Sequence, residues 1–154
     1  MVKTVGEKLI SRGITISACE SCTGGLFASK LTDIPGISAV FDRGLVTYSY
    51  RAKIEELGVK EETLCIYSAE SYEVAEEMVL GLKEKTGSDV CVSVTGLAGP
   101  GGGTDEKPVG TIYVACAYDG KVDVKKLQTG SGDRSYNREY AVKEMFKLID
   151  RMIG

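Results

Sequence analysis

The chain has 154 residues and a formal net charge of −3, and 43% of its residues are hydrophobic and 27% charged. This length is typical of one domain, and the composition excludes an intrinsically disordered chain. No run of Lys and Arg is present, so the sequence offers no electrostatic attraction to nucleic acid. Because no long apolar run and no signal-peptide pattern occur, we expect a cytoplasmic protein that binds neither nucleic acid nor membrane.

Histidine is absent from the chain, and the five cysteines include only one closely spaced pair. An odd number of scattered cysteines is a poor disulfide framework and fits a reducing compartment. Without imidazole there is no Ser-His or Cys-His couple, and the usual catalytic zinc sites are excluded as well. A general base acting near neutral pH must therefore be Lys, Asp, Glu, Tyr or a thiolate.

Helical and strand-like segments alternate through the first half of the chain. The spacing of apolar residues and the glycines that follow them predict helices at 3–12, 26–33 and 51–58. Runs of β-branched residues predict strands at 14–18 and 44–49. The segment 34–38 reads as a loop. Ser21 falls at the junction between the first strand and the second helix.

The second half continues the alternation and adds one long irregular segment. Its pattern predicts helices at 71–87 and 135–152 and a strand at 89–96. The segment 97–110 reads as a loop, and 111–118 and 122–129 read as the two strands of a hairpin. No internal repeat or linker interrupts this order. The sequence therefore predicts a single layered α/β domain.

The stretch "CESCTGG" at 19–25 contains a C-x-x-C spacing, formed by Cys19 and Cys22. A redox pair needs a stabilised thiolate, which the strand-to-helix junction could supply. A tetrahedral zinc site needs two further soft ligands, but the remaining cysteines are isolated. The favoured interpretation is that these cysteines are small packing residues.

Ser21, between the two cysteines, has two interpretations. A serine on a strand-to-helix turn before glycines can face outward as a nucleophile, with backbone N–H groups nearby to hold an oxyanion. Serine is equally common as an ordinary helix N-cap. Without histidine, the nucleophile interpretation requires a base such as a lysine of lowered pKa. Lys53 follows a predicted strand, although a lysine in a short helix is usually solvated.

The loop "GLAGPGGGT" holds five glycines directly after a predicted strand. Glycines allow backbone amides to converge on an anion, but neither the P-loop nor the dinucleotide-binding spacing is present. A flexible surface turn explains the glycines alone. A 14-residue loop in a small domain is more typical of a functional segment, so we favour ligand binding.

Arg134 and Arg138 lie four residues apart at the predicted start of the last helix. A guanidinium fork and a helix N-terminus both suit a phosphate group. The alternative, which the sequence supports equally, is a pair of solvated arginines on an exposed helix end.

Five segments occur in an order that resembles the CinA C-terminal domain family: "ESCTGG", "LTDIPGISAVFDRGLVTYS", "AKIEELGV", "SVTGLAGPGGGTDEKPVGTIYVA" and "GDR". The resemblance covers about residues 14 to 150. It implies a three-layer α/β/α sandwich with a mixed, mostly parallel sheet. It also implies an amidohydrolase of the pyridine nucleotide cycle, which converts nicotinamide mononucleotide to nicotinic acid mononucleotide and ammonia. A homo-oligomer without cofactor or metal is expected.

The resemblance also assigns roles to residues of this sequence. Ser21 is implied as the nucleophile, Lys53 as its base, and Tyr48 as the group that orients the lysine or relays its proton. The remaining site residues are expected to contact the substrate, either through the turn after Ser21 or through ribose-phosphate contacts: Thr23, Gly24, Gly25, Ser38, Gly99, Gly101, Gly102, Gly103 and Arg134.

The chain departs from the usual family pattern at a few positions. Tyr50 and Arg51 are expected to change the surroundings of Lys53. Glu70 stands where a small apolar residue is usual, and Cys19 stands where alanine is usual. No proposed catalytic group is removed, so the departures bear on substrate fine tuning and on rate. A non-catalytic nucleotide-binding or regulatory module remains the alternative function.

Overall fold

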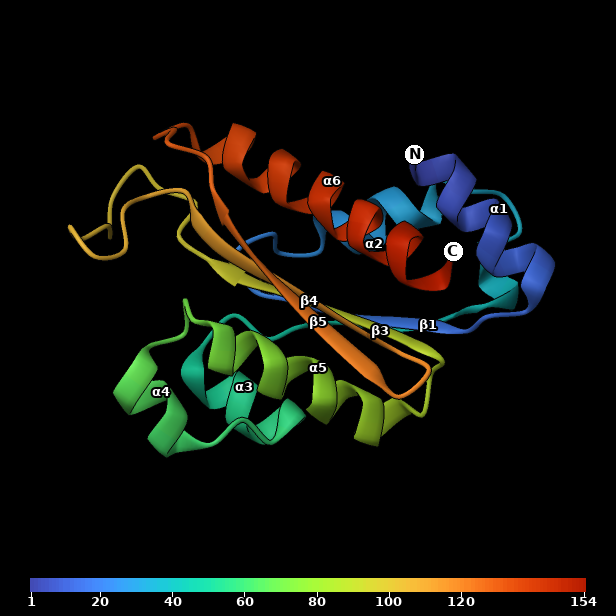
Figure 1. The fold of residues 1–154 in the computed structure, drawn as a ribbon, viewed down its shortest axis with the longest axis horizontal. Coiled ribbons are helices and arrows are strands. Elements are labelled where there is room, and N and C mark those ends of the chain that lie inside the picture. Colours follow the sequence, from blue (N-terminus) through green and yellow to red (C-terminus); the bar gives the residue numbers. More distant parts are fainter.

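A five-stranded sheet separates two layers of helices (Figure 1). The structure is a computed structural model that describes residues 1–154. The strands lie side by side in the order β2-β1-β3-β4-β5. Their bounds are Ile16–Glu20 for β1, Phe41–Val46 for β2, Val90–Gly96 for β3, Thr111–Tyr118 for β4 and Lys121–Gln128 for β5.

The sheet is mixed. β1 pairs in parallel with both β2 and β3, whereas β4 runs antiparallel to its neighbours β3 and β5. Four strands thus share one direction, and β4 alone is reversed. The expected three-layer sandwich with a mixed, mostly parallel sheet is confirmed.

The helices are divided between the two faces of the sheet (Figure 1). One face carries α1 (Val2–Arg12), α2 (Leu26–Thr32) and α6 (Arg134–Ile153), with the short 3₁₀ turn η1 (Ile37–Ala39). The other face carries α3 (Tyr50–Leu57), α4 (Glu61–Tyr67) and α5 (Tyr72–Thr86). None of the helices combines the length and apolar character that crossing a bilayer requires.

Each face of the sheet has its own apolar core, because alternate side chains of a strand point to opposite faces. In β1, Ala18 packs into the core under α1, α2 and α6, whereas Cys19 packs into the core under α3 and α5. All five residues of β1 are buried, as expected for a strand covered on both faces. The central strands therefore hold the two helical layers in fixed relative positions.

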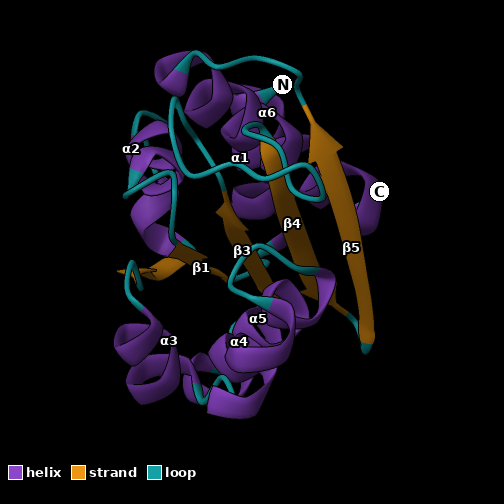
Figure 2. Ribbon diagram, turned by 90° about the vertical axis from the view of Figure 1, so that its left-hand side faces the viewer, coloured by secondary structure: helices purple, strands orange, loops and turns teal.

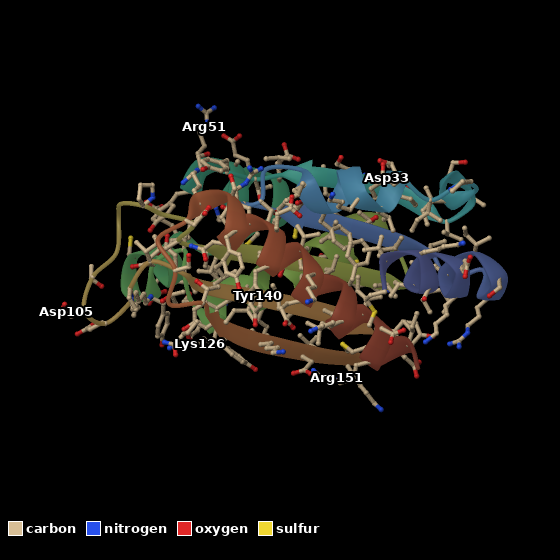
Figure 3. All side chains as sticks on the ribbon, turned by 90° about the horizontal axis from the view of Figure 1, so that it is seen from above. Asp33, Arg51, Asp105, Lys126, Tyr140 and Arg151 are labelled. Carbon is tan, nitrogen blue, oxygen red and sulfur yellow. The ribbon has the colours of Figure 1, made fainter.

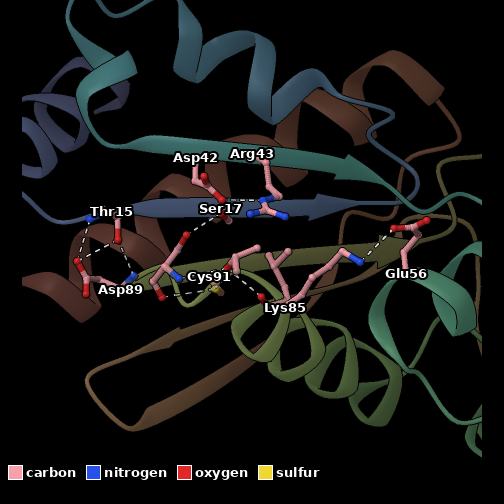
Figure 4. Close-up of polar contacts among 11 residues, drawn as sticks. Thr15, Ser17, Asp42, Arg43, Glu56, Lys85, Asp89 and Cys91 are labelled. Atoms are coloured by element: carbon pink, nitrogen blue, oxygen red, sulfur yellow. Dashed lines mark hydrogen bonds and ion pairs between the residues drawn. The ribbon is translucent and has the colours of Figure 1, made fainter.

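Polar contacts fix the amino ends of β1 and β3 against each other (Figure 4). The backbone N–H and hydroxyl of Thr15 both donate to Asp89 Oδ2 at 3.0 Å, and the Asp89 N–H donates back to Thr15 Oγ1 at 2.9 Å. Beside them, the hydroxyls of Ser17 and Ser88 lie 2.7 Å apart. These bonds lock the register of the two strands whose other ends carry the site described below.

Most predicted elements are found, although the first strand spans Ile16–Glu20 rather than 14–18 and the turn η1 was not predicted. The second strand ends at Val46 rather than residue 49, because Ser49 is the N-cap of α3 and its hydroxyl accepts from the Ala52 N–H at 3.0 Å. Helix α4 was not predicted. It spans fewer than two full turns, and its N-cap Lys60 provides no side-chain cap, so its sequence lacks the usual start signal.

Parallel strands place their carboxyl ends at one edge of the sheet, where ligands bind in α/β folds. The chain leaves β1 toward the face of α2 and leaves β2 toward the face of α3. Figure 2 looks at this edge, with α2 and α3 on either side of β1. The segments after β1, β2 and β3 therefore meet around an opening between the two helical layers.

Gly81 provides a test of how closely α3 and α5 pack. A Cβ built at Gly81 lies 1.7 Å from the backbone oxygen of Leu57, which cannot move without displacing the end of α3. Gly81→Ala should lower the free energy of unfolding by at least about 2 kcal/mol, although Ala normally stabilises a helix relative to Gly. Urea denaturation measures this change. As a control, Leu80→Ala should change the free energy of unfolding little, because the neighbouring Leu80 is exposed. A Gly81→Ala variant more stable than the unmodified protein would contradict the close approach of α5 to α3.

Candidate active site

Ser21 begins the turn that leads from β1 into α2. Its backbone N–H donates to the Val94 carbonyl of β3 at 3.0 Å, which ties the residue to the neighbouring strand. Gly24 and Gly25 have φ angles of 58° and 103°, a left-handed conformation that glycine adopts without steric strain. The glycines thus allow the sharp turn that leaves the Ser21 side chain at the carboxyl edge of the sheet.

Glu20 fixes this turn through hydrogen bonds to its carboxylate. Its side chain is buried, and its carboxylate accepts from Thr23 Oγ1 at 2.6 Å and from the N–H groups of Phe27 and Ala28 at 2.9 and 3.1 Å. Gly25 is the N-cap of α2 and has no side chain to cap it, so Glu20 satisfies the free N–H groups instead. The N-cap interpretation of Ser21 is therefore wrong.

Arg138 also holds this turn. Its Nε and one terminal nitrogen donate to the carbonyls of Cys22 and Thr23 at 3.2 and 2.8 Å. Its guanidinium is thus occupied by the protein backbone and does not line a cavity with Arg134. The hypothesis that Arg134 and Arg138 form a joint phosphate fork is not supported by this geometry.

Lys53 points its amine at Ser21. The side chain comes from α3 and is 1% exposed. Nζ donates to Ser21 Oγ at 3.0 Å, to the Thr47 carbonyl at 2.9 Å and to the Tyr48 carbonyl at 3.3 Å. Three oxygen acceptors therefore surround one buried amine, and one of them is the hydroxyl of the candidate nucleophile.

Burial lowers the pKa of the Lys53 amine below its ordinary value of 10.5, because desolvation disfavours the charged form. The negative charge of Glu70 is the largest influence that opposes this shift. Burial also raises the pKa of the Cys22 thiol to about 12, so it stays uncharged near neutral pH. The lysine is thus prepared to give up a proton more readily than a solvated lysine.

Tyr48 and Arg134 form the rim of the site. The Arg134 guanidinium donates to the Tyr48 hydroxyl at 3.0 Å and to the Gly99 carbonyl at 2.7 Å, so it links the segments after β2 and β3. Tyr48 approaches Lys53 through its backbone carbonyl, whereas its phenol is exposed and faces Arg134. The contact with Lys53 is thus made by the Tyr48 carbonyl and not by its phenol, and the role of Tyr48 in orienting Lys53 or relaying its proton stays a prediction.

These groups enclose a cavity of about 220 Å³. A larger cavity of about 540 Å³ adjoins it and shares two lining residues, Glu70 and Leu97. The smaller cavity is lined by residues from the ends of β1, β2 and β3 and the segments after them, from α3, from the bend before α5 and from the start of α6: Ser21, Cys22, Tyr48, Tyr50, Lys53, Ala69, Glu70, Gly96, Leu97, Ala98, Gly99, Gly101 and Arg134.

Only some residues of the predicted glycine loop line the two cavities. Gly99 and Gly101 line the smaller cavity, and Gly102 lines the larger one. Gly103 lines neither, because it packs against Val109, where a Cβ would lie 2.7 Å from a backbone nitrogen. The loop between β3 and β4 extends away from the sheet, with Asp105 near its tip (Figure 3).

Other predicted residues lie outside the cavity. Thr23, Gly24 and Gly25 belong to the turn that carries Ser21 but do not line the cavity. Ser38 is exposed in η1, before the start of β2. Because β1 and β2 are parallel, Ser38 lies at the opposite end of the sheet from Ser21, so its expected place in the site is corrected.

The departures from the family pattern at Tyr50, Arg51 and Glu70 have different outcomes. Arg51 pairs with Glu55 at 2.6 Å and projects from α3 into solvent (Figure 3), so it does not change the surroundings of Lys53 as expected. Tyr50 and Glu70 do line the cavity. The sequence showed both as unusual residues, but it did not show that they line the same cavity, because the bend before α5 was not predicted.

The two cysteines of the C-x-x-C spacing belong to different cores. Cys19 contacts the Met78 and Val92 carbonyls in the core beneath α5, whereas Cys22 packs in the core beneath α2 and α6. Burial raises the pKa of both thiols. They lack the stabilised thiolate that a redox pair needs, which supports their interpretation as packing residues.

Comparison with known proteins identifies the family of this chain. The family model of the CinA C-terminal domain matches residues 1–153. A CinA-like protein of Chloroherpeton thalassium is 48% identical over 153 residues, which cover 97% of this chain and 36% of that protein. A CinA-like protein of Kosmotoga olearia is 52% identical over 141 residues, covering 92% of this chain and 34% of that protein. The chain thus spans about a third of the length of these relatives.

Solved structures match over nearly the whole fold. The competence/damage inducible protein CihA from Agrobacterium tumefaciens superposes with a TM-score of 0.94 at 37% identity, covering 99% of this chain and 96% of that chain. A CinA superfamily protein from Klebsiella pneumoniae superposes with a TM-score of 0.91 at 34% identity, covering 96% and 92%. The chain therefore belongs to the CinA C-terminal domain family.

Thiol accessibility tests the interpretation of the cysteines. Cys65 is exposed and the other four cysteines are buried. A thiol reagent should therefore modify one cysteine per native chain rapidly, and all five only after denaturation. Cys65→Ser should remove the rapid phase. A second rapid thiol, or a disulfide between Cys19 and Cys22 formed by mild oxidation of the native protein, would contradict the burial described here.

Proposed function

We propose that this protein is an amidase that hydrolyses the carboxamide of nicotinamide mononucleotide to nicotinic acid mononucleotide and ammonia. The observation that carries the proposal is the 3.0 Å contact between the Lys53 amine and Ser21 Oγ at a cavity, in a chain without histidine. A buried lysine of lowered pKa is a known means of activating a serine. The sequence resemblance supplies the substrate class.

In the proposed reaction, Ser21 Oγ bonds to the carboxamide carbon while its proton passes to the neutral amine of Lys53. The tetrahedral intermediate then collapses, and the carbon–nitrogen bond breaks as Lys53 returns the proton to the departing nitrogen, which leaves as ammonia. A water molecule, deprotonated by Lys53, attacks the resulting acyl ester. Cleavage of the ester returns a proton to Ser21 and releases the carboxylate.

The oxyanion of each tetrahedral intermediate needs preorganised donors. The Ser21 N–H is already bonded to the Val94 carbonyl, so the next N–H group of the turn, that of the cavity-lining residue Cys22, is the proposed donor. Glu20 and Arg138 hold this turn rigid, which keeps such donors in place at little reorganisation cost. One oxyanion donor is commonly worth about 3 kcal/mol of transition-state stabilisation.

Arg134 is the proposed contact for the substrate phosphate. Its guanidinium has five N–H donors, and the Gly99 carbonyl and Tyr48 hydroxyl hold it at the rim of the cavity. The remaining donors are free to bind phosphate oxygens. Gly99 and Gly101 line the cavity beside it without side chains, so the ribose-phosphate can approach the backbone closely.

Ammonia release from nicotinamide mononucleotide tests the proposal. Ser21→Ala and Lys53→Met should each lower kcat by at least about 1000-fold, since each removes a member of a cooperating pair. Lys60→Met is a matched control, because Lys60 is an exposed lysine away from the cavity. Saturable binding measured by calorimetry without ammonia release from the unmodified protein would instead indicate a non-catalytic nucleotide-binding module.

The pH dependence of kcat/KM tests the role of Lys53. Burial lowers the pKa of Lys53, and only its neutral form can accept the Ser21 proton. Activity should therefore fall as the pH drops through a single ionisation with a pKa below 10.5. The profile is measured from about pH 6 to about pH 10. A profile that is flat across this range would contradict lysine as the general base.

A further inference from the structure

The bend between α4 and α5 is held rigidly beside the candidate active site. Ser68 adopts a φ of 67°, and the Ser71 hydroxyl donates to its carbonyl at 2.9 Å. The Ala69 N–H donates to the Tyr50 hydroxyl at 3.3 Å, and the Ala69 carbonyl accepts from Thr95 Oγ1 at 3.0 Å. The next residue, Glu70, therefore projects from a backbone fixed by α3, by β3 and by the cap of α5.

The Glu70 carboxylate is available to a ligand. Glu70 is partly buried and lines both cavities, yet it takes part in none of the hydrogen bonds or ion pairs of the protein. In contrast, Lys107 donates to the Tyr67 carbonyl across the larger cavity, and Arg134 is held by Gly99 and Tyr48. Glu70 is thus the one charged side chain of the smaller cavity without a protein partner.

Opposite charges enter the smaller cavity from opposite faces of the sheet. Arg134 comes from the start of α6, and Glu70 comes from the bend before α5. The same cavity is lined by Lys53, whose buried amine contacts Ser21. A cavity with a fixed cation on one side and a free carboxylate on the other is complementary to a ligand that carries both charges.

We propose that Glu70 determines specificity by favouring an amide attached to a positively charged ring over the same amide attached to a neutral ring. The inference rests on the amidase activity proposed above and deepens it. Oxidised nicotinamide mononucleotide has a cationic pyridinium ring and an anionic phosphate, whereas its dihydro form has a neutral ring and the same carboxamide, ribose and phosphate. The carboxylate attracts the cationic ring directly, and Glu70 makes no hydrogen bond to Ser21 or Lys53 that would give it a proton-transfer role.

The test compares kcat/KM for oxidised and reduced nicotinamide mononucleotide in the unmodified protein and in Glu70→Gln. The two amides differ in intrinsic reactivity, but this difference cancels when the oxidised-to-reduced ratio is compared between variants. Glu70→Gln should lower the ratio about two- to fivefold, as expected for loss of a partly exposed ion pair. Glu106→Gln is the matched control, because Glu106 lines only the larger cavity and its loss removes the same net charge.

A pH profile separates the electrostatic role from a structural one. The charged or titratable groups that act on the Lys53 amine are Glu70, Cys22 and Cys19, and Glu70 makes the largest opposing contribution to its lowered pKa. Since the carboxylate stabilises the ammonium form, Glu70→Gln should move the acid limb of the kcat/KM profile to lower pH. Loss of packing alone would leave the midpoint of that limb unchanged.

Binding measurements keep the two proposals apart. In a Ser21→Ala background, calorimetry compares the affinities for the oxidised and reduced nucleotides with and without Glu70→Gln. An equal oxidised-to-reduced affinity ratio in both variants, together with an unchanged kcat/KM ratio, would overturn the role of Glu70 and leave the amidase proposal intact. Absence of ammonia release from either nucleotide would overturn the amidase proposal, and the affinity ratio would still decide whether Glu70 recognises the ring charge.

Discussion

The burial of the Lys53 amine against Ser21 Oγ is the interaction on which the rest of the site depends. Removing an ammonium group from water is costly, so a buried lysine needs oxygen acceptors around it or loses its proton. The protein provides the carbonyls of Thr47 and Tyr48 and the Ser21 hydroxyl. These acceptors hold the amine in place, while its burial makes the proton easier to release.

This placement follows from the topology of the sheet. Thr47 follows β2, Ser21 follows β1, and these parallel strands end at the same edge. α3 begins directly after β2 and brings Lys53 back under that edge within its first turns. Glu20 and Arg138, from β1 and α6, then fix the turn that carries Ser21. Two helical layers thus contribute to one hydroxyl–amine contact.

Local patterns and the absence of histidine allowed much of this arrangement to be predicted. The alternating elements predicted the layered fold, and the missing imidazole directed attention to lysine as the base. Ser21, Lys53, Gly99 and Arg134 were identified from the sequence and lie around one cavity in the structure. Their catalytic and binding roles stay predictions.

The errors have a common physical cause, because they concern contacts between residues distant in the chain. Ser38 was placed in the site by its motif, yet parallel pairing carries it to the other end of the sheet. Arg138 had the spacing of a phosphate ligand, yet it bonds backbone carbonyls over 100 residues away in the chain. No local pattern reveals that Tyr50 supports the bend at Glu70, because that contact requires the packing of α3 beside α5.

The most direct measurement of the central claim is an NMR titration of the lysine side chains in the unliganded protein. The resonance of Lys53 is assigned by its absence from the spectrum of Lys53→Met. If Lys53 is the buried base described here, its amine titrates with a pKa clearly below 10.5, the ordinary value for a lysine side chain. A Lys53 pKa at or above 10.5 would contradict the account.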